Sequence, residues 1–229
     1  KQGKRARRIV PHPALEENLS AESVLQAERI VAQVGPEVIM DLWEQNPDLD
    51  GVIAGRSRDV GLYAAIPLLH GFDKGLAMHF GKVMEDGALA ATPGSGNDGL
   101  LGIIREDHFD VRPTNPKRRC TPESVTGHAF YERSDPNREA NPGGDLDISQ
   151  AVYTQLDEVT VRVSGARWIE APAYTVKLEG AAKTGYRSIC IAGMRDPQVV
   201  ANVELILEES RDIVEDYFSY LAEDSYALN

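Results

Sequence analysis

No stretch of the 229-residue chain is apolar for long enough to span a membrane, which takes about 20 such residues. The first eight residues are largely basic, but no apolar segment typical of a secretory signal peptide follows them. The sequence has only two cysteines, Cys120 and Cys190, and they do not form a paired metal-binding motif. We therefore expect a cytoplasmic protein with two reduced thiols and no membrane contact.

The sequence also lacks a metal-binding signature, because its five histidines are dispersed and none belongs to a His-Glu-x-x-His pattern. Carboxylate sites leave little trace in a sequence, so metal dependence stays open, and whether the protein uses a cofactor is unknown. Acidic residues outnumber basic ones by 36 to 24, and five of the basic residues fall within residues 1–10, which contain no acid. The acidic remainder repels phosphate backbones, so nucleic acid is not an expected partner.

The basic start of the chain has two interpretations. It is either an arm for nucleic acid or a solvated segment that leads out of a missing portion, and we favour the second. The chain begins at Lys1 rather than at methionine, so we expect a processed protein or an N-terminally truncated piece of a longer one.

Hydrophobic periodicity and turn residues predict an α/β protein, α+β overall. A strand–turn–helix first part is followed by a largely antiparallel β segment that a long C-terminal helix closes. Helices are expected over residues 20–34, 37–45, 62–69, 74–91, 121–133 and 197–221. Strands are expected over residues 49–55, 151–154, 160–163, 174–178 and 188–191, with 100–111 ambiguous but favouring a strand.

The change of character near residue 145 predicts two domains. Residues 1–145 form a helix-rich α/β segment, and residues 146–229 form an antiparallel β segment with the C-terminal helix. The stretch over 134–145 is rich in Pro, Gly, Asn and Asp and is expected to be a surface loop. The alternative is one continuous domain that belongs to a larger protein.

Acid–base chemistry is indicated by the predicted helix over 74–91. His79, Lys82 and Asp86 share one face of that helix, with Glu85 beside them. A histidine next to carboxylates suits proton transfer near neutral pH. We name His79, Glu85 and Asp86 as candidate catalytic residues. The alternative is a solvated charged face.

Two loops are candidate anion sites. Gly94, Ser95 and Gly96 open a Gly-x-Gly-x-x-Gly string, but a helix rather than a strand is expected before it. An anion-binding loop or a plain turn therefore fits better than a dinucleotide site. Arg118 and Arg119 precede a predicted helix start, which suits a carboxylate or phosphate. We expect the glycine loop and this arginine turn to bind the same anion.

Arg56 follows the strand predicted over 49–55, and ligands of open α/β sheets lie beyond the carboxyl ends of strands. We expect Arg56 to bind a substrate carboxylate and Asp59 to orient it. The alternative is an internal ion pair between the two side chains, which contributes little when exposed.

Three further residues complete the candidates. Lys177 lies on a predicted strand and Arg195 in a loop, and both are taken as anion-binding residues. Cys120 follows the arginine pair, and it is either a thiol of lowered pKa or a small buried side chain.

Nine strings of the sequence resemble one family. Together they resemble the acyclic terpene utilisation AtuA family (N-terminal domain), in the same order across nearly all of residues 48–210. They are IAGRSRD (53–59), MEDGA (84–88), PGSG (93–96), RRCTP (118–122), HAFYE (128–132), NPGG (141–144), VRVSG (161–165), YTVKLEG (174–180) and IAGMRDP (191–197).

The resemblance implies catabolism of acyclic terpenes such as citronellol and geraniol, or of other small branched acids. It also implies a further α/β portion before this region and a small partner domain, fused or separate. The family often has cysteine at the position of Asp86, so no thiol role is carried over there, and no catalytic residue is transferred.

From the residues and the resemblance together, we expect an enzyme or enzyme subunit that acts on a small carboxylate or acyl thioester, by a lyase or hydratase step. The alternative is a non-catalytic assembly subunit that scaffolds a partner protein. The missing portion leaves apolar sheet surface to be covered, so we expect a homo-oligomer or a complex with a small partner subunit.

Overall fold

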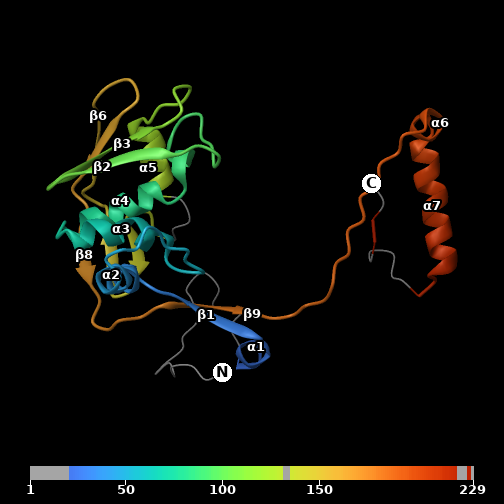
Figure 1. Cartoon of the computed structure of the whole chain (residues 1–229), viewed down its shortest axis with the longest axis horizontal. Coiled ribbons are helices and arrows are strands. Elements are labelled where there is room, and N and C mark those ends of the chain that lie inside the picture. The colour runs from blue at the N-terminus through green and yellow to red at the C-terminus, as the bar shows by residue number, and fades with distance from the viewer. Residues whose placement is uncertain (1–20, 131–134, 221–225, 228–229) are drawn as a thin grey trace. The chain divides into compact units, whose positions relative to one another are not determined.

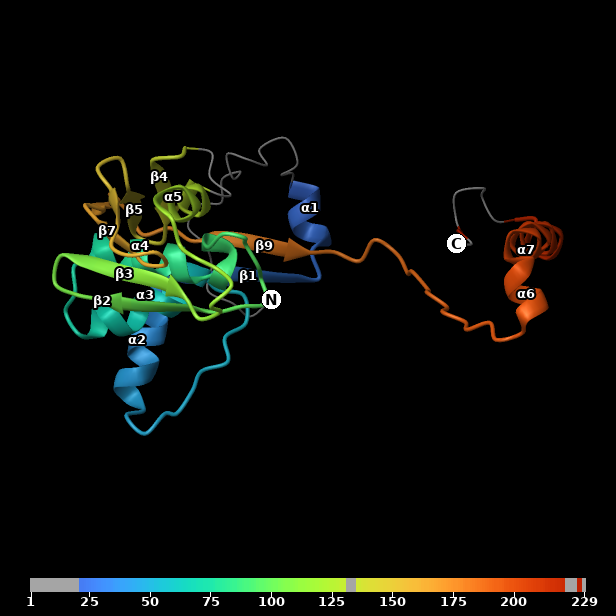
Figure 2. The same ribbon diagram turned by 90° about the horizontal axis from the view of Figure 1, so that it is seen from above.

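The computed structural model of the chain describes residues 21–130, 135–220 and 226–227. The chain divides into two compact units, of which the first extends to Lys183 and the second begins at Thr184. Figures 1 and 2 show the helices and strands of each unit in two views. Each unit is described by itself below.

The described part of the first unit combines α-helices with antiparallel sheets. Its helices are α1 (Ala21–Gln26), α2 (Pro36–Gln45), α3 (Asp59–Leu69), α4 (Lys74–Met84), the 3-10 helix η2 (Gly87–Ala90) and α5 (Pro122–Phe130). Its strands are β1 (Arg29–Gln33), β2 (Leu100–Ile104), β3 (His108–Pro113), β4 (Arg138–Asn141), β5 (Gly144–Asp147), β6 (Val152–Gln155), β7 (Val161–Ser164), β8 (Arg167–Glu170) and β9 (Lys177–Ala181).

The strands form three sheets, in the orders β1-β9, β2-β3-β7-β6 and β4-β5-β8, and every pair is antiparallel. The turn between β4 and β5 is Pro142-Gly143, with Gly143 at a φ of 80°. Proline followed by a glycine of positive φ is typical of a tight turn. This hairpin places two alternate residues of β4, Glu139 and Asn141, on one buried face.

Helix α4 is the central element of the first unit, because every residue from Gly75 to Met84 is buried. One side of α4 packs against the four-stranded sheet through Leu76, Phe80 and Val83, and the other side packs against α3 and β5 through Ala77 and Met78. Figure 2 shows α4 among these elements. The side chains at the C-terminal end of α4 are therefore held in a fixed place by the core on two sides.

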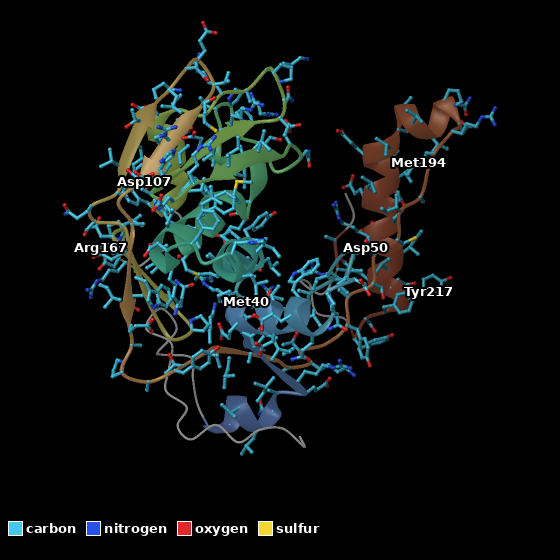
Figure 3. All side chains as sticks on the ribbon, turned by 60° about the vertical axis from the view of Figure 1, so that its left-hand side comes forward. Met40, Asp50, Asp107, Arg167, Met194 and Tyr217 are labelled. Carbon is cyan, nitrogen blue, oxygen red and sulfur yellow. The ribbon has the colours of Figure 1, made fainter. Side chains whose placement is uncertain are left out.

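Glycines allow α4 to approach its neighbours closely. A Cβ on Gly75 would lie 2.6 Å from the Cα of Arg167 in β8, a residue labelled in Figure 3. A Cβ on Gly81 would collide with the carbonyl oxygen of Val60 in α3. The crossing of α3 and α4 therefore requires glycine at position 81.

The expected mixture of α-helices and antiparallel strands is confirmed, and α2, α5, β6 and β7 lie close to their predicted positions. The strand predicted over 49–55 is wrong. Residues 51–54 have no ladder partner among the described residues, and Ile53 is fully exposed instead of buried. An apolar run in a sequence predicts a strand. A strand, however, also needs a neighbouring strand that pairs with its backbone N–H and C=O groups.

Other boundaries also differ from the predictions. The helix predicted over 20–34 ends at Gln26, and its second half is β1. The helix predicted over 74–91 ends at Met84, because Gly87 has a φ of 58° and starts a separate 3-10 helix. The predicted loop over 134–145 contains β4 and the start of β5, although residues 131–134 lie outside the described part. Residues 188–191 do not form the predicted strand.

The described part of the second unit contains α6 (Pro197–Ala201) and α7 (Val203–Tyr217), so the helix predicted over 197–221 is divided near Asn202. Residues 221–225, at the end of that prediction, lie outside the described residues. The Asp196 carboxylate caps α6 by accepting from the backbone N–H groups of Gln198 and Val199. The predicted division at residue 145 falls within β5, and it stays a prediction. None of the described helices is both long and apolar enough to cross a membrane.

Candidate functional site

A buried ion pair lies at the C-terminal end of α4. The Nζ atom of Lys82 is 2.5 Å from the Oε1 atom of Glu85, and the two side chains are only 3% and 9% exposed. Lysine and glutamate are rarely so deeply buried, because each charge loses its hydration. The core on both sides of α4 therefore encloses a pair that contributes little to stability by itself.

A second buried pair lies next to the first. Arg58 is the residue before α3, and its guanidinium donates to the Glu139 carboxylate and, through Nε, to the Asn141 side-chain oxygen at 2.9 Å. Glu139 and Asn141 are both buried on β4. The Arg58 side chain is 26% exposed, so this second pair is less enclosed than the first.

The two pairs share one electrostatic environment. Burial is the main cause that raises the pKa of Glu85, and its contact with Lys82 opposes this shift. The Glu139 carboxylate raises the pKa of Glu85 further, and the Arg58 guanidinium lowers it. We call Arg58, Lys82, Glu85, Glu139 and Asn141 the buried network. It joins the start of α3, the end of α4 and one face of β4.

A histidine–carboxylate contact adjoins the buried network. The Nε2 atom of His128 on α5 is 3.8 Å from the Oδ2 atom of Asp86, the residue after Glu85. The His128 side chain is buried, whereas that of Asp86 is 42% exposed. Asp86 therefore lies at the surface next to Glu85 in the sequence and within 4 Å of the buried His128 ring.

The buried network unites segments that are far apart in the sequence. Four of the strings that carry the family resemblance contribute to it or to the adjoining contact, through Arg58, through Glu85 and Asp86, through His128 and through Asn141. A buried carboxyl of raised pKa in contact with a lysine is the kind of group that can give or take a proton. The Arg58 guanidinium beside it is engaged by Glu139 and Asn141.

The structure places His79 apart from the end of α4. Its ring is fully buried, with Nε2 3.1 Å from the hydroxyl oxygen of Tyr153. It also lies edge-on to the rings of Phe109 and Tyr153, at centroid distances of 5.5 and 5.8 Å. His79 therefore packs toward the four-stranded sheet, one helical turn before Lys82. The alternative interpretation, in which these charged residues form a solvated face of the helix, is wrong because Lys82 and Glu85 are buried.

The glycine loop and the arginine turn do meet, but through the chain's own groups. Arg118 pairs through Nε with Asp98, and its Nη1 donates to the carbonyl oxygens of Pro93 and Gly94. The hydroxyl oxygen of Ser95 accepts from the backbone N–H of Asn97 at 3.1 Å.

The rest of this region is held by backbone contacts. Arg119 joins Thr92 by two backbone hydrogen bonds of 2.7 and 3.0 Å, and Gly96 is exposed. The guanidinium of Arg118 is thus engaged within the loop, and binding of an external anion here stays a prediction.

Arg56 does not lie in the buried network. Its side chain is 52% exposed, and its Nε atom is 3.1 Å from the Oε2 atom of Glu179 on β9. Lys177 approaches the other oxygen of Glu179 at 3.4 Å, and Gln33 donates to that oxygen at 2.8 Å. Asp59 is exposed at the first position of α3. Arg56 and Lys177 therefore gather around one carboxylate at the edge of the β1-β9 sheet.

The remaining candidates lie elsewhere. Arg195 is exposed in the second unit, directly before the cap of α6. Cys120 is fully buried, and its burial raises the pKa of the thiol to about 12. The alternative of a thiol with a lowered pKa is therefore wrong, and the small buried side chain is the better interpretation.

Sequence reasoning missed Arg58, Glu139 and Asn141. The sequence favours Arg56, two residues before Arg58, as the arginine that binds a substrate carboxylate. The signal for the other two was the Pro-Gly pair at 142–143 with alternating residues before it, which is typical of a hairpin. Among residues 21–130, 135–220 and 226–227, no group of three or more His, Cys, Asp or Glu side chains is placed to hold a metal ion.

Comparison with known proteins gives one match. A family model described as "Acyclic terpene utilisation family protein AtuA" matches residues 111–226, which is just over half of the chain. The match covers β4, which carries Glu139 and Asn141 of the buried network, and α5, which carries His128. No curated protein and no solved structure matches the chain.

Proposed function

The chain belongs to the acyclic terpene utilisation AtuA family, and from this premise we propose that it is an enzyme or enzyme subunit with acid–base chemistry at the buried network. Its substrates are small branched carboxylates or their acyl thioesters. The observation that carries the proposal is Glu85, a buried carboxyl of raised pKa in contact with Lys82. Buried carboxyls of this kind serve as proton donors and acceptors near neutral pH.

The roles within the site follow from burial and geometry. We assign the carboxylate of the substrate to Arg58, whose side chain is partly exposed and is held in place by Glu139 and Asn141. Glu85 takes a proton from the substrate carbon or gives one to a leaving hydroxyl. A carboxylate-binding arginine and a proton-carrying carboxyl suit a lyase or hydratase step, in which a C–C or C–O bond breaks next to an activated C–H bond.

The test is turnover by the full-length chain, with Glu85→Gln as the variant. Citronellate, geranate and their coenzyme A thioesters form the substrate panel, and loss or addition of water or cleavage is followed by mass spectrometry. Glu85→Gln keeps the shape of the side chain but removes its proton chemistry, so we expect a loss of about 10²–10⁴-fold in kcat. The exposed Glu106→Gln is the matched control and retains full activity.

Equal turnover by the Glu85→Gln variant and the unchanged protein contradicts the proposal. A folded variant is required for this comparison, so the near-UV circular dichroism of both proteins is recorded first. Absence of turnover from the unchanged chain across the whole panel also counts against an enzyme that is complete in itself.

A second candidate function is a non-catalytic assembly subunit. The observation that favours it is the amphipathic helix α7, in which no residue is buried and an apolar stripe ends at Tyr217, labelled in Figure 3. Such a stripe is typical of a helix that packs against another surface. A partner with fixed stoichiometry in the native host, with activity that follows the partner's residues, supports this candidate over the enzyme.

A further inference from the structure

We propose that two copies of the chain pair through strand β2, so that their four-stranded sheets join into one continuous sheet. This inference goes beyond the proposed function, because it concerns a surface that contains none of the residues of the buried network. Within the described residues, β2 pairs with β3 and with no other strand, so it is an edge of the sheet. Figure 2 shows β2 beside β3.

The first observation is the direction of the backbone groups of β2. The N–H of Arg105, directly after β2, donates to the carbonyl oxygen of His108 at 2.8 Å. Because hydrogen-bonded residues alternate along an antiparallel pair, the odd-numbered residues of β2 bond to β3 and the even-numbered ones point away from it. The outward N–H and C=O groups are those of Leu100, Gly102 and Ile104. In the part of the chain that the structure describes, no backbone hydrogen bond involves them.

The second observation is that β2 lacks the usual protection of an edge strand. It reads Leu-Leu-Gly-Ile-Ile, without a charge or a proline, and its register with β3 is continuous, without a bulge. Natural edge strands commonly use these devices to prevent pairing with another chain. On the outer face of the sheet, Leu101 and Ile103 are 41% and 43% exposed. A free and uncharged edge with exposed apolar side chains is a template for the addition of a strand.

The third observation is the symmetry of β2, which favours a second copy as its partner. Gly102 is the centre of the strand, with two leucines before it and two isoleucines after it. In an antiparallel pair centred on Gly102, Leu100 of each copy lies opposite Ile104 of the other, and their outward backbone groups exchange hydrogen bonds. Leu101 then lies opposite Ile103 of the second copy. This two-fold arrangement uses the same surface of both copies and brings their four exposed side chains together.

The charges beyond the two ends of β2 are complementary in this arrangement. The turn after β2 consists of Glu106 and Asp107, which are both exposed. Arg118 pairs with Asp98, two residues before β2, so the loop that carries Arg118 and the exposed Lys117 borders the start of the strand. Because the paired strands are antiparallel, the acidic turn of each copy lies beside this basic loop of the other. Opposite charges at both ends favour this register in a chain whose net charge is −12.

Sedimentation of the full chain over a wide range of concentrations tests the proposal. The contact is small, so we expect a monomer–dimer equilibrium in the micromolar range. Ile103→Lys places a charge within the apolar contact and is expected to weaken dimerisation by at least about tenfold. Val152→Lys is the matched control, because Val152 is 55% exposed on β6, at the other edge of the same sheet. The control is expected to dimerise as the unchanged protein does.

Disulfide formation tests the register separately. Leu101→Cys and Ile103→Cys are each made in a chain with Cys190→Ser, because Cys190 is the exposed cysteine. Residues 101 and 103 of two copies lie opposite each other in a non-hydrogen-bonded pair, where the Cβ atoms are close enough for a disulfide. After mild oxidation, a mixture of the two variants is expected to contain several-fold more crosslinked dimer than either variant alone.

Three results overturn the proposal. One is a chain that stays monomeric at every concentration. Another is a dimer that Ile103→Lys weakens no more than Val152→Lys does, because its interface then lies elsewhere on the molecule. The third is equal crosslinking in the mixture and in each cysteine variant alone, which contradicts a pair centred on Gly102. If Ile103→Lys does not fold, the cysteine variants decide.

Discussion

Glu85 is a residue whose affinity for its proton is changed by the fold. Its pKa is raised by burial above the value of 4.5 that the unfolded chain has. The folded state therefore binds the proton more tightly, and the contribution of Glu85 to stability is greatest below pH 4.5 and is lost as the pH rises through the folded pKa. At neutral pH, ionised Glu85 destabilises the fold, and Lys82 limits that cost.

The two cysteines give a prediction at the scale of single residues. Cys120 is buried with a thiol pKa raised to about 12, whereas Cys190 is exposed. The thiolate is the reactive form, so at pH 8 a disulfide reagent such as dithionitrobenzoate reacts with Cys190 and not with Cys120. Cys190→Ser therefore has no fast-reacting thiol, and Cys120→Ser has one. A fast reaction in Cys190→Ser that does not require unfolding contradicts the buried position of Cys120.

The sequence alone does not distinguish the roles of the two neighbouring arginines, Arg56 and Arg58. Residues 55–58 read Gly-Arg-Ser-Arg, and both arginines suit a carboxylate equally well by type. The difference lies in what surrounds them, because Arg58 meets Glu139 and Asn141 from β4, some eighty residues later, and Arg56 meets Glu179. Long-range contacts of this kind leave no local pattern, so helix α4, which ends directly before Glu85, was predictable and the partner of Arg58 was not.

Helix α4 gives a prediction at the scale of elements. Gly81→Ala places a methyl group against the carbonyl oxygen of Val60, so α3 and α4 must separate. We expect a loss of about 1–3 kcal/mol in the free energy of unfolding, as overpacking usually costs. Gly127→Ala on α5 is the control, because its Cβ meets nothing within 4 Å. The control is expected to gain about 0.5–1 kcal/mol from the better helix propensity of alanine.

Urea unfolding of both glycine variants checks this prediction. Because Gly81 lies one residue before Lys82, the same variant is also expected to lower the activity of the buried network. Equal stability of Gly81→Ala and Gly127→Ala would mean that the crossing of the two helices is looser than described.

A helix or strand can be predicted from the sequence when its own residues mark its boundaries or its buried face. Helix α2 begins with Pro36 and ends before Pro47, so the sequence marks both of its boundaries, and β7 alternates between buried and half-buried residues. The strand expected over 49–55 failed because strand formation depends on a neighbouring strand, which no hydrophobic pattern reveals. The second half of the helix expected over 20–34 is β1, which owes its form to pairing with β9, about 150 residues later.

The first unit as a whole brings together the strings that looked unrelated along the sequence. Arg58, Glu85 and Asn141 come from three different strings and lie in one buried network. Of the elements that contribute to the network, only β4 falls within the residues that match the family model, whereas Arg58, Lys82 and Glu85 precede them. We propose that the substrate carboxylate binds to this network and not to the exposed side chains of Arg56 and Lys177 around Glu179.

The most direct test measures the binding of citronellate by calorimetry. The affinity of the full chain is compared with the affinities of its Arg58→Lys and Arg56→Lys variants. Lysine keeps the charge of arginine but loses its two-pronged geometry. The account predicts that Arg58→Lys weakens binding by at least about 1 kcal/mol, while Arg56→Lys binds as the unchanged protein does. Weakened binding in a folded Arg56→Lys, together with normal binding in Arg58→Lys, would contradict the account and move the site to the edge of the β1-β9 sheet.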